Sequence, residues 1–155
     1  MMTATHQMFE RTPTGISPRV QKLRREINPD APPVYITITP SAGCVPNDCF
    51  ECVRQKVARD GGQIQYGWAI WEWPRIHVEA EHHGVYEPPT GPPWMDITPS
   101  GLPEIRRRLF LRDDSATYDF DHEGALRDNR RLALCDRPSH PTVFRRSERG
   151  KQDYE

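Results

Sequence analysis

A cysteine, a histidine and an aspartate occur in that order between Pro46 and Pro99, in surroundings that could equip them for nucleophilic chemistry. The cysteine is Cys49, which follows Asp48 and precedes Glu51 by two positions. This D-x-x-E pattern predicts a helix N-terminus with a capping box. Free backbone N–H groups and the helix dipole favour an anion at such a terminus, so a thiol placed there ionises readily. Cys49 is therefore a candidate nucleophile.

The histidine and the aspartate lie on two predicted strands, residues 76–86 and 94–98, which are joined by a turn rich in proline and glycine. If the strands pair antiparallel, the Cβ atoms of His83 and Asp96 are roughly 5–8 Å apart. A carboxylate at that distance can orient an imidazole and stabilise its protonated form. His82 is the alternative base, because a register shift of one residue exchanges the two faces of the strand.

Four stretches together resemble a known superfamily: N-D-C-F-E-C-V, Y-G-W-A-I-W-E-W-P, E-A-E-H-H-G-V-Y and W-M-D-I-T-P. Their layout is similar to the cysteine–histidine–aspartate core of the papain-like and transglutaminase-like superfamily. Small members such as the NlpC/P60 peptidases and the N-terminal glutamine amidohydrolases are closest in size and order. The resemblance covers about residues 34–99.

The resemblance implies a thiol-dependent hydrolase that acts on an amide bond, as a peptidase, amidase or deamidase, without a cofactor. Cys49 would attack a peptide or carboxamide carbonyl, His83 would transfer the proton and Asp96 would hold the imidazole. The loop before the nucleophile lines the cleft in papain-like folds, so Ser41 and Cys44 are the candidates for the oxyanion hole, with the Cys49 amide. An amine in place of water would make the enzyme an acyltransferase.

Two other interpretations of the same stretch stay open. Cys52 lies one helical turn after Cys49 and is an alternative nucleophile, although the helix dipole helps it less. Cys44, Cys49 and Cys52 also form a C-x4-C-x2-C pattern, which His82 or His83 could complete to a Cys3His zinc site in a structural or interaction domain. A catalytically inactive module with a papain-like shape is the third interpretation.

The predicted fold class is α+β: an antiparallel β-meander packed against an N-terminal helix and the helix that carries Cys49. Ser17 and Pro18 predict the start of the N-terminal helix and Asn28-Pro29 its end. Residues 34–39 and 64–73 have strand patterns, and Gly61 marks the end of the Cys49 helix.

The second half of the chain gives weaker signals. Leu109-Phe110-Leu111 predicts an edge strand, and the preceding Arg106-Arg107-Arg108 is typical of surface residues that protect a sheet edge, with an anion contact as the alternative. Residues 118–121 alternate aromatic and acidic side chains without a recognisable metal-loop spacing. Residues 128–134 predict a last short element over the sheet.

The domain organisation follows from length and composition. With 155 residues, the chain is long enough for one domain and too short for two. We expect a flexible arm at residues 1–15, a single papain-like domain at 16–144 and a disordered charged tail at 145–155.

The composition also limits location and partners. A net charge of −1 gives no general surface for polyanions, so a nucleic acid is not an expected partner. We find neither an apolar run of membrane-spanning length nor the pattern of a signal peptide, and we expect a cytoplasmic protein whose four cysteines are thiols or metal ligands.

Overall fold

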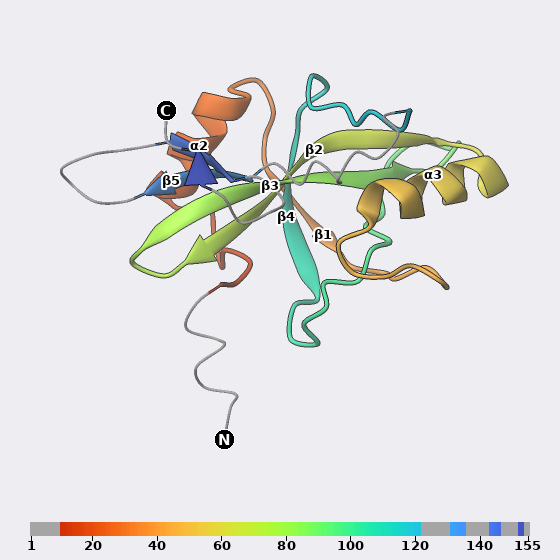
Figure 1. Ribbon diagram of the computed structural model, residues 1–155, viewed down its shortest axis with the longest axis horizontal. Coiled ribbons are helices and arrows are strands. Elements are labelled where there is room, and N and C mark those ends of the chain that lie inside the picture. Colours follow the sequence, from red (N-terminus) through yellow and green to blue (C-terminus); the bar gives the residue numbers. More distant parts are fainter. Residues whose placement is uncertain (1–9, 122–130, 136–142, 147–151, 154–155) are drawn as a thin grey trace.

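The computed structural model describes residues 10–121, 131–135, 143–146 and 152–153. Within these residues it is an α+β fold with an antiparallel sheet and two helices, as predicted (Figure 1). The elements are α2 (Pro18–Ile27), β1 (Val34–Thr37), α3 (Cys49–Asp60), β2 (Gln63–Trp73), β3 (His77–Glu87), β4 (Arg107–Arg112), β5 (Arg131–Cys135), β6 (Val143–Arg146) and β7 (Gln152–Asp153). The sheet has the strand order β1-β4-β2-β3-β5-β6-β7.

The helix α2 begins where the sequence predicts it. The Ser17 side chain accepts a hydrogen bond from the Val20 backbone N–H at 3.3 Å, and Pro18 occupies the first turn, where it has no N–H to leave unpaired. Val20 and Leu23 are buried and pack onto one face of the sheet. This packing covers the end of the sheet opposite to α3 (Figure 1).

The strand β4 differs from its predicted position at a sheet edge. It lies between β1 and β2, and Phe110 pairs with Val34 on one side and with Ala69 on the other. Its three apolar residues, Leu109, Phe110 and Leu111, have no solvent exposure. The prediction was wrong because a short apolar run can be a strand buried on both faces as well as an edge strand.

Backbone pairing continues from β3 back to β1 through the segment around Asp96. Met95 and Tyr86 exchange two backbone hydrogen bonds of 2.8 Å, and Ile38, just after β1, forms a parallel bridge with Asp96. The Thr39 N–H also donates to the Asp96 carbonyl at 2.8 Å. Together with the β1-β4-β2-β3 order, these bonds close the sheet into a small ring, so the sheet has an inner and an outer face.

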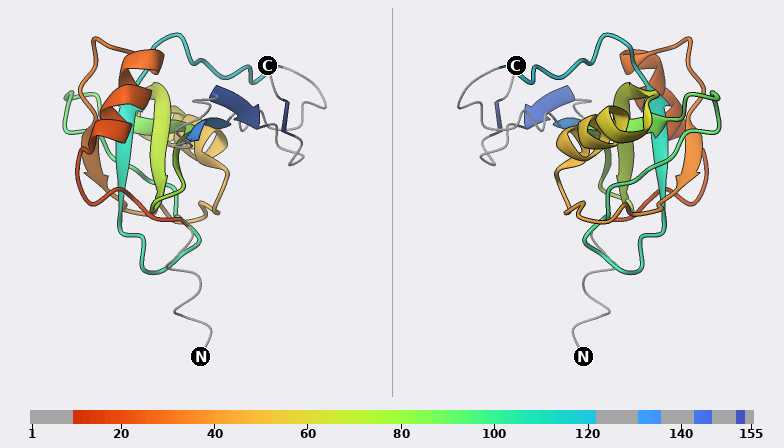
Figure 2. Two further views of the ribbon diagram at one scale, coloured as in Figure 1. Left: turned by 90° about the vertical axis from the view of Figure 1, so that its left-hand side faces the viewer. Right: turned by 90° about the vertical axis from the view of Figure 1, so that its right-hand side faces the viewer.

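Side chains alternate between these two faces along each strand. On the inner face, Ile36, Val85 and Phe110 form a cluster against which Trp94 packs. Both helices lie on the outer face (Figure 2): α2 covers a cluster that includes Trp68 and Ile70, and α3 covers another. The outer cluster under α3 consists of Cys52, Val53, Tyr86 and Ile97.

Part of the expected N-terminal arm is held against the sheet. Arg11 exchanges backbone hydrogen bonds of 2.7 and 2.9 Å with Glu72 of β2, and its guanidinium Nε lies 3.0 Å from the Glu72 carboxylate. Residues 1–9 of the expected arm lie outside the described residues.

The expected charged tail contains short strands. β6 extends to Arg146, and residues 152–153 pair with it as β7. The rest of the expected tail lies outside the described residues. β5 falls where the sequence predicts a last short element at 128–134 and pairs with β3. In the part of the chain that the structure describes, neither helix is long and apolar enough to cross a membrane.

Candidate functional site

His83 and Asp96 meet inside the ring. β3 places the His83 side chain on the inner face, and the segment that closes the ring places Asp96 opposite it. The His83 Nε2 and Asp96 Oδ2 atoms are 3.0 Å apart, and both side chains are almost fully buried. The sequence indicated this proximity, since the turn after β3 brings these positions together. The predicted strand at 94–98 is not a full strand, because in this segment only Met95 and Asp96 form single bridges.

Arg108 is a third member of this buried group that the sequence analysis did not identify. Its Nη1 atom lies 2.8 Å from Asp96 Oδ2 and donates to the Thr98 carbonyl at 2.8 Å, while Nη2 donates to the Pro99 carbonyl at 3.3 Å. Arg108 is buried, whereas its neighbour Arg107 is exposed. The interpretation of the arginine trio as surface residues was therefore wrong for this position.

Strand alternation explains the inward position of Arg108 and could have predicted it. Arg108 is two residues from Phe110 and so lies on the same face of β4. Phe110 is completely buried on the inner face. An arginine there is compatible with folding only if a carboxylate and carbonyl oxygens meet its guanidinium, and Asp96, Thr98 and Pro99 supply them.

The pKa values of His83 and Asp96 depend on the charges that surround them. Burial lowers the pKa of His83, but the negative charges of Asp96 and Cys49 outweigh burial and the opposing charge of Arg108, and the pKa rises to about 9. Burial raises the pKa of Asp96, but His83 and Arg108 outweigh it and hold that pKa below its usual value. At neutral pH the pair is therefore an imidazolium and a carboxylate.

The helix α3 begins at Cys49 as predicted, but without the predicted capping box. The Asp48 side chain makes no capping hydrogen bond. The Glu51 carboxylate accepts hydrogen bonds from Arg54 Nε at 2.9 Å and from Gln55 Nε2 at 3.1 Å. Asp48 has φ −125° and ψ 34°, outside the extended conformation that directs an N-cap side chain at the first turn. The start of α3 is therefore not capped by Asp48.

Cys49 is 5% exposed, and its charge is among those that raise the pKa of His83. Since His83 Nε2 faces Asp96, Nδ1 is the ring nitrogen left for the thiol. Within the described residues no hydrogen bond joins Cys49 to His83. Catalytic contacts are often longer in a protein without substrate than in the reacting complex.

A cavity of about 220 Å³ opens at the start of α3. It is lined by Asn47, Asp48, Cys49, Phe50, Glu51, Tyr118 and Phe120. The last two residues come from the loop after β4 and were not identified as site residues from the sequence. The alternation of aromatic and acidic residues at 118–121 was the only signal, and it does not reveal which side chains the folded chain brings to Cys49.

The alternative base, His82, lies on the outer face of β3, away from Asp96. Its Nε2 atom contacts the Ala116 carbonyl oxygen, and its ring packs between Phe50 and Trp68 with centroid distances of 4.6 and 5.4 Å. The structure therefore brings His83, and not His82, together with the aspartate.

The backbone amides of the two oxyanion-hole candidates are already engaged. The Ser41 N–H donates to the Ile97 carbonyl at 3.0 Å, and the Cys44 N–H donates to the Ser41 carbonyl at 3.1 Å. These amides cannot also serve an oxyanion without breaking those bonds. The Ser41 hydroxyl and the Cys49 amide are the donors that remain from the predicted set.

The zinc interpretation finds no ligand set in the residues that the structure describes. No group of three or more histidine, cysteine, aspartate or glutamate side chains is arranged there to hold a metal ion, and Cys44, Cys49, Cys52 and His82 all belong to this part of the chain. Burial and a hydrogen bond with Cys44 raise the pKa of Cys52 to about 12. Cys52 is therefore protonated at neutral pH, which makes it a poor nucleophile.

Comparisons with protein-family models, curated proteins and solved structures find no match for this chain. The chemistry of the site is therefore inferred from its own residues: a cysteine at a helix start beside a cavity, and a buried histidine–aspartate pair.

Proposed function

We propose that this protein is a thiol-dependent hydrolase that acts on the amide bond of a peptide or carboxamide, with Cys49, His83 and Asp96 as a catalytic triad. One observation carries the proposal: a buried imidazole, His83, lies 3.0 Å from the buried Asp96 carboxylate, in a protein whose Cys49 begins a helix at the wall of a cavity. A cysteine on a helix with histidine and aspartate on neighbouring chain segments, in this order, is also the layout of papain-like folds.

In the first step the Cys49 sulfur attacks the amide carbon and the C–S bond forms. The imidazolium of His83 gives its proton to the leaving nitrogen, the C–N bond breaks and an amine or ammonia departs. Asp96 keeps the ring oriented and stabilises its positive charge before this transfer. A pKa of His83 near 9 means that the proton is present at neutral pH.

In the second step a water molecule attacks the acyl carbon of the thioester. The neutral imidazole of His83 takes the proton of that water, the C–S bond breaks and the carboxylic acid leaves. The thiolate and the imidazolium are restored. The oxyanion formed in both steps lies beside the first turn of α3, where the Cys49 amide and the Ser41 hydroxyl are the proposed donors.

A reducing compartment such as the cytoplasm suits this chemistry. Cys44, Cys49 and Cys52 are free cysteines, and a nucleophilic thiol must stay reduced to react.

Alkylation of Cys49 by iodoacetamide tests the proposal, with each cysteine followed by peptide mass spectrometry between about pH 5.5 and 9.5. We expect Cys49 to be labelled well below the range near 8.5 in which free thiols ionise, because the His83 imidazolium stabilises its thiolate. His83→Gln should lower the labelling rate at pH 6 by about tenfold or more. Cys44 and Cys52 in the same sample serve as internal references.

His82→Gln is the matched control, because it makes the same change one residue away on the outer face of β3. It should leave the low-pH labelling of Cys49 in place. If His83→Gln and His82→Gln have equal effects, or if Cys49 does not react below pH 8 in the unmodified protein, the proposed triad is wrong. The buried pair would then be a structural part of the ring.

A further inference from the structure

The cavity beside Cys49 has aromatic walls. The rings of Phe50 and Tyr118 stack with centroids 4.4 Å apart and an angle of 9° between their planes. Phe120 meets Tyr118 edge to face, with centroids 4.9 Å apart, and it is 37% exposed. The aromatic faces carry partial negative charge, so such a wall attracts cations as well as apolar groups.

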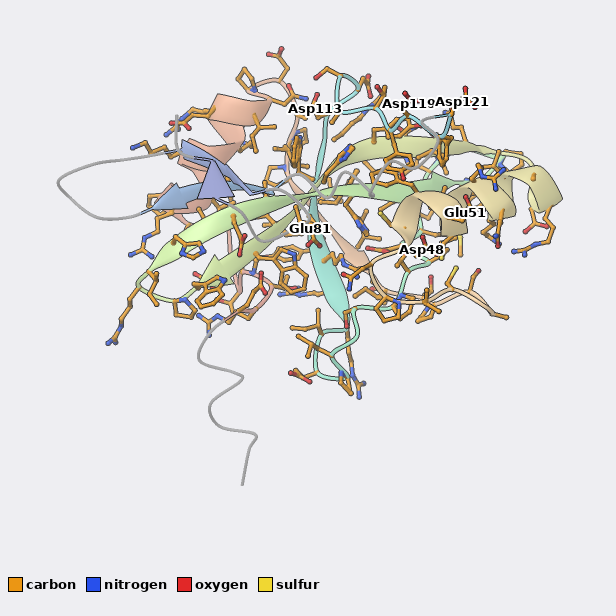
Figure 3. All side chains as sticks on the ribbon, in the orientation of Figure 1. Asp48, Glu51, Glu81, Asp113, Asp119 and Asp121 are labelled. Atoms are coloured by element: carbon orange, nitrogen blue, oxygen red, sulfur yellow. The ribbon has the colours of Figure 1, made fainter. Side chains whose placement is uncertain are left out.

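Two carboxylates line the same cavity, and two more flank one of its lining residues in the sequence. Asp48 and Glu51 line it from the start of α3, and Asp119 and Asp121 flank Phe120 on the loop that forms the other wall. Figure 3 shows Glu51 and Asp48 at α3, with Asp119 and Asp121 on the loop above this helix. Glu51 forms an ion pair with Arg54, and Glu51 and Asp48 together bring negative charge to the wall of the cavity.

The protein itself places a cation against this aromatic wall. The Arg54 guanidinium carbon lies 6.0 Å from the centroid of Phe120, and 54% of the Arg54 side chain is exposed. Since this exposed arginine can move without loss of core packing, an incoming cation can share or replace its position.

The size of the cavity restricts what can enter it. A volume of about 220 Å³ corresponds to about seven water molecules at their volume in the liquid. Drug-sized ligands occupy cavities of about 300 Å³ or more. The cavity therefore suits one side chain of a substrate, held next to the carbonyl that Cys49 attacks.

We infer that this cavity selects substrates that carry a guanidinium or ammonium group next to the attacked amide. The inference rests on the proposed function, since it assigns the group bound beside the Cys49 nucleophile. Tyr118 and the partly exposed Phe120 hold the stem and the cationic head of that group, while Asp48 and the loop carboxylates provide the opposite charge and offset the positive end of the α3 dipole.

Charge-matched thiol reagents test the charge preference at Cys49 itself. The cationic trimethylammonioethyl and the anionic sulfonatoethyl methanethiosulfonates carry similar reactive heads. The ratio compared is the rate constant of the cationic reagent divided by that of the anionic reagent. We expect this ratio to be larger at Cys49 than at 2-mercaptoethanol, a neutral thiol, by about tenfold or more. A ratio equal to that of 2-mercaptoethanol would overturn the inference.

Three variants localise the preference. Asp48→Asn and Phe120→Leu should each reduce the ratio by at least about threefold, because the first removes a charge and the second an aromatic face. Asp60→Asn is the control, since it makes the same charge change at the opposite end of α3, in an exposed ion pair with Lys56. A drop of equal size in Asp60→Asn would show a general charge effect and contradict a specific site.

Equilibrium binding separates this inference from the proposed function. Arginine amide and citrulline amide have similar shapes, and only the first is cationic. Cys49→Ala, which cannot react, should bind arginine amide at least about tenfold more tightly than citrulline amide in calorimetry. If this preference holds while Cys49 stays inert to iodoacetamide, the cavity is a cation site and the triad fails. If Cys49 is activated through His83 but neither the reagent rates nor the binding of the two amides shows a preference for the cation, the triad stands and the cation site fails.

Discussion

The residue that connects the fold to the proposed chemistry is Asp96. It forms a hydrogen bond or ion pair with both His83 and Arg108, and its second carboxylate oxygen accepts the Thr98 N–H at 3.3 Å. Burying a lone carboxylate would cost several kcal/mol, and two cationic partners together offset this cost. The same two partners keep Asp96 ionised, which it must be to hold an imidazolium.

Local sequence patterns do not reveal the role of Arg108, and replacing Arg108 tests that role. In Arg108→Met we expect the pKa of His83 to rise above about 9, because the guanidinium charge lowers it in the unmodified protein. The free energy of unfolding should fall by about 3 kcal/mol, since a buried carboxylate loses one of its partners. NMR titration of the His83 ring measures the pKa, and chemical denaturation measures the free energy of unfolding.

Arg107→Met is the control for this change, because Arg107 is exposed and its guanidinium lies 4.0 Å over the Tyr35 ring. It should alter stability by less than about 1 kcal/mol and leave the His83 titration unchanged. Should Arg108→Met not fold, Arg108→Lys keeps a positive charge and can be titrated instead. An unchanged pKa of His83 in Arg108→Met would show that Arg108 has no electrostatic role at the site.

At the scale of elements, the contact between α3 and β3 sets the position of Cys49. A Cβ atom at Gly84 would lie 3.1 Å from two carbons of the Phe50 ring, closer than most carbon contacts in proteins. Phe50 is the next residue after Cys49 and is buried. The absence of a side chain at Gly84 therefore lets the first turn of α3 approach β3.

Gly84→Ala tests this contact. We expect the free energy of unfolding to fall by about 1–3 kcal/mol, because the added methyl group overpacks against a buried ring. The loss should be smaller when Phe50→Leu is also present, since the smaller side chain makes room. Urea denaturation of the two single variants and the double variant measures the coupling.

Gly15→Ala is the matched control, because a Cβ atom at Gly15 would meet nothing within 4 Å. It should change stability by less than about 0.5 kcal/mol. If the Gly84→Ala loss is the same with Phe50 and with leucine at that position, the two residues are not coupled and Gly84 does not position α3.

At the scale of the whole molecule, the closed ring takes the polar pair out of water. The pairing through Met95 and Asp96 completes the ring, and the inner cluster of Ile36, Val85 and Phe110 lies on the same face as His83. The Phe110 and His83 ring centroids are 6.4 Å apart. Ionisation of His83 and Asp96 is therefore linked to global stability.

This linkage predicts how stability depends on pH. The pKa of His83 rises from 6.5 to about 9 on folding, so its stabilisation is complete below pH 6.5 and is lost as the pH rises through 9. The pKa of Asp96 is lowered, so its stabilisation is complete above about pH 3.8 and is lost at lower pH. We expect a maximum between about pH 4 and 6.5 and a decline of about 3 kcal/mol towards pH 9.

Denaturation curves across this pH range test the linkage. Asp96→Asn should flatten the decline above pH 6.5, because the carboxylate that raises the pKa of His83 is removed, whereas His82→Gln should retain it. Direct NMR titration of His83 in the unmodified protein covers the case in which Asp96→Asn does not fold. A His83 pKa near 6.5, or equal slopes in all three proteins, would contradict the linkage.

The sequence by itself determined the local elements and one pair of the site. Local signals predict the α2 helix after Ser17, the β2 and β3 strands and the proximity of His83 to Asp96. The helix α3 also begins at Cys49 as predicted, although the predicted capping box does not form. Capping residues, strand alternation and a turn rich in proline and glycine act over a few neighbouring residues, so a single chain displays them.

Only the tertiary structure decided the rest. The central position of β4, the inward-facing Arg108, the uncapped start of α3 and the cavity wall formed by Tyr118 and Phe120 depend on contacts between residues far apart in the chain. Strand order and ring closure decide which face of a strand is buried and which charges meet there. Local patterns carry no information about these partners, because they are chosen by the packing of the whole chain.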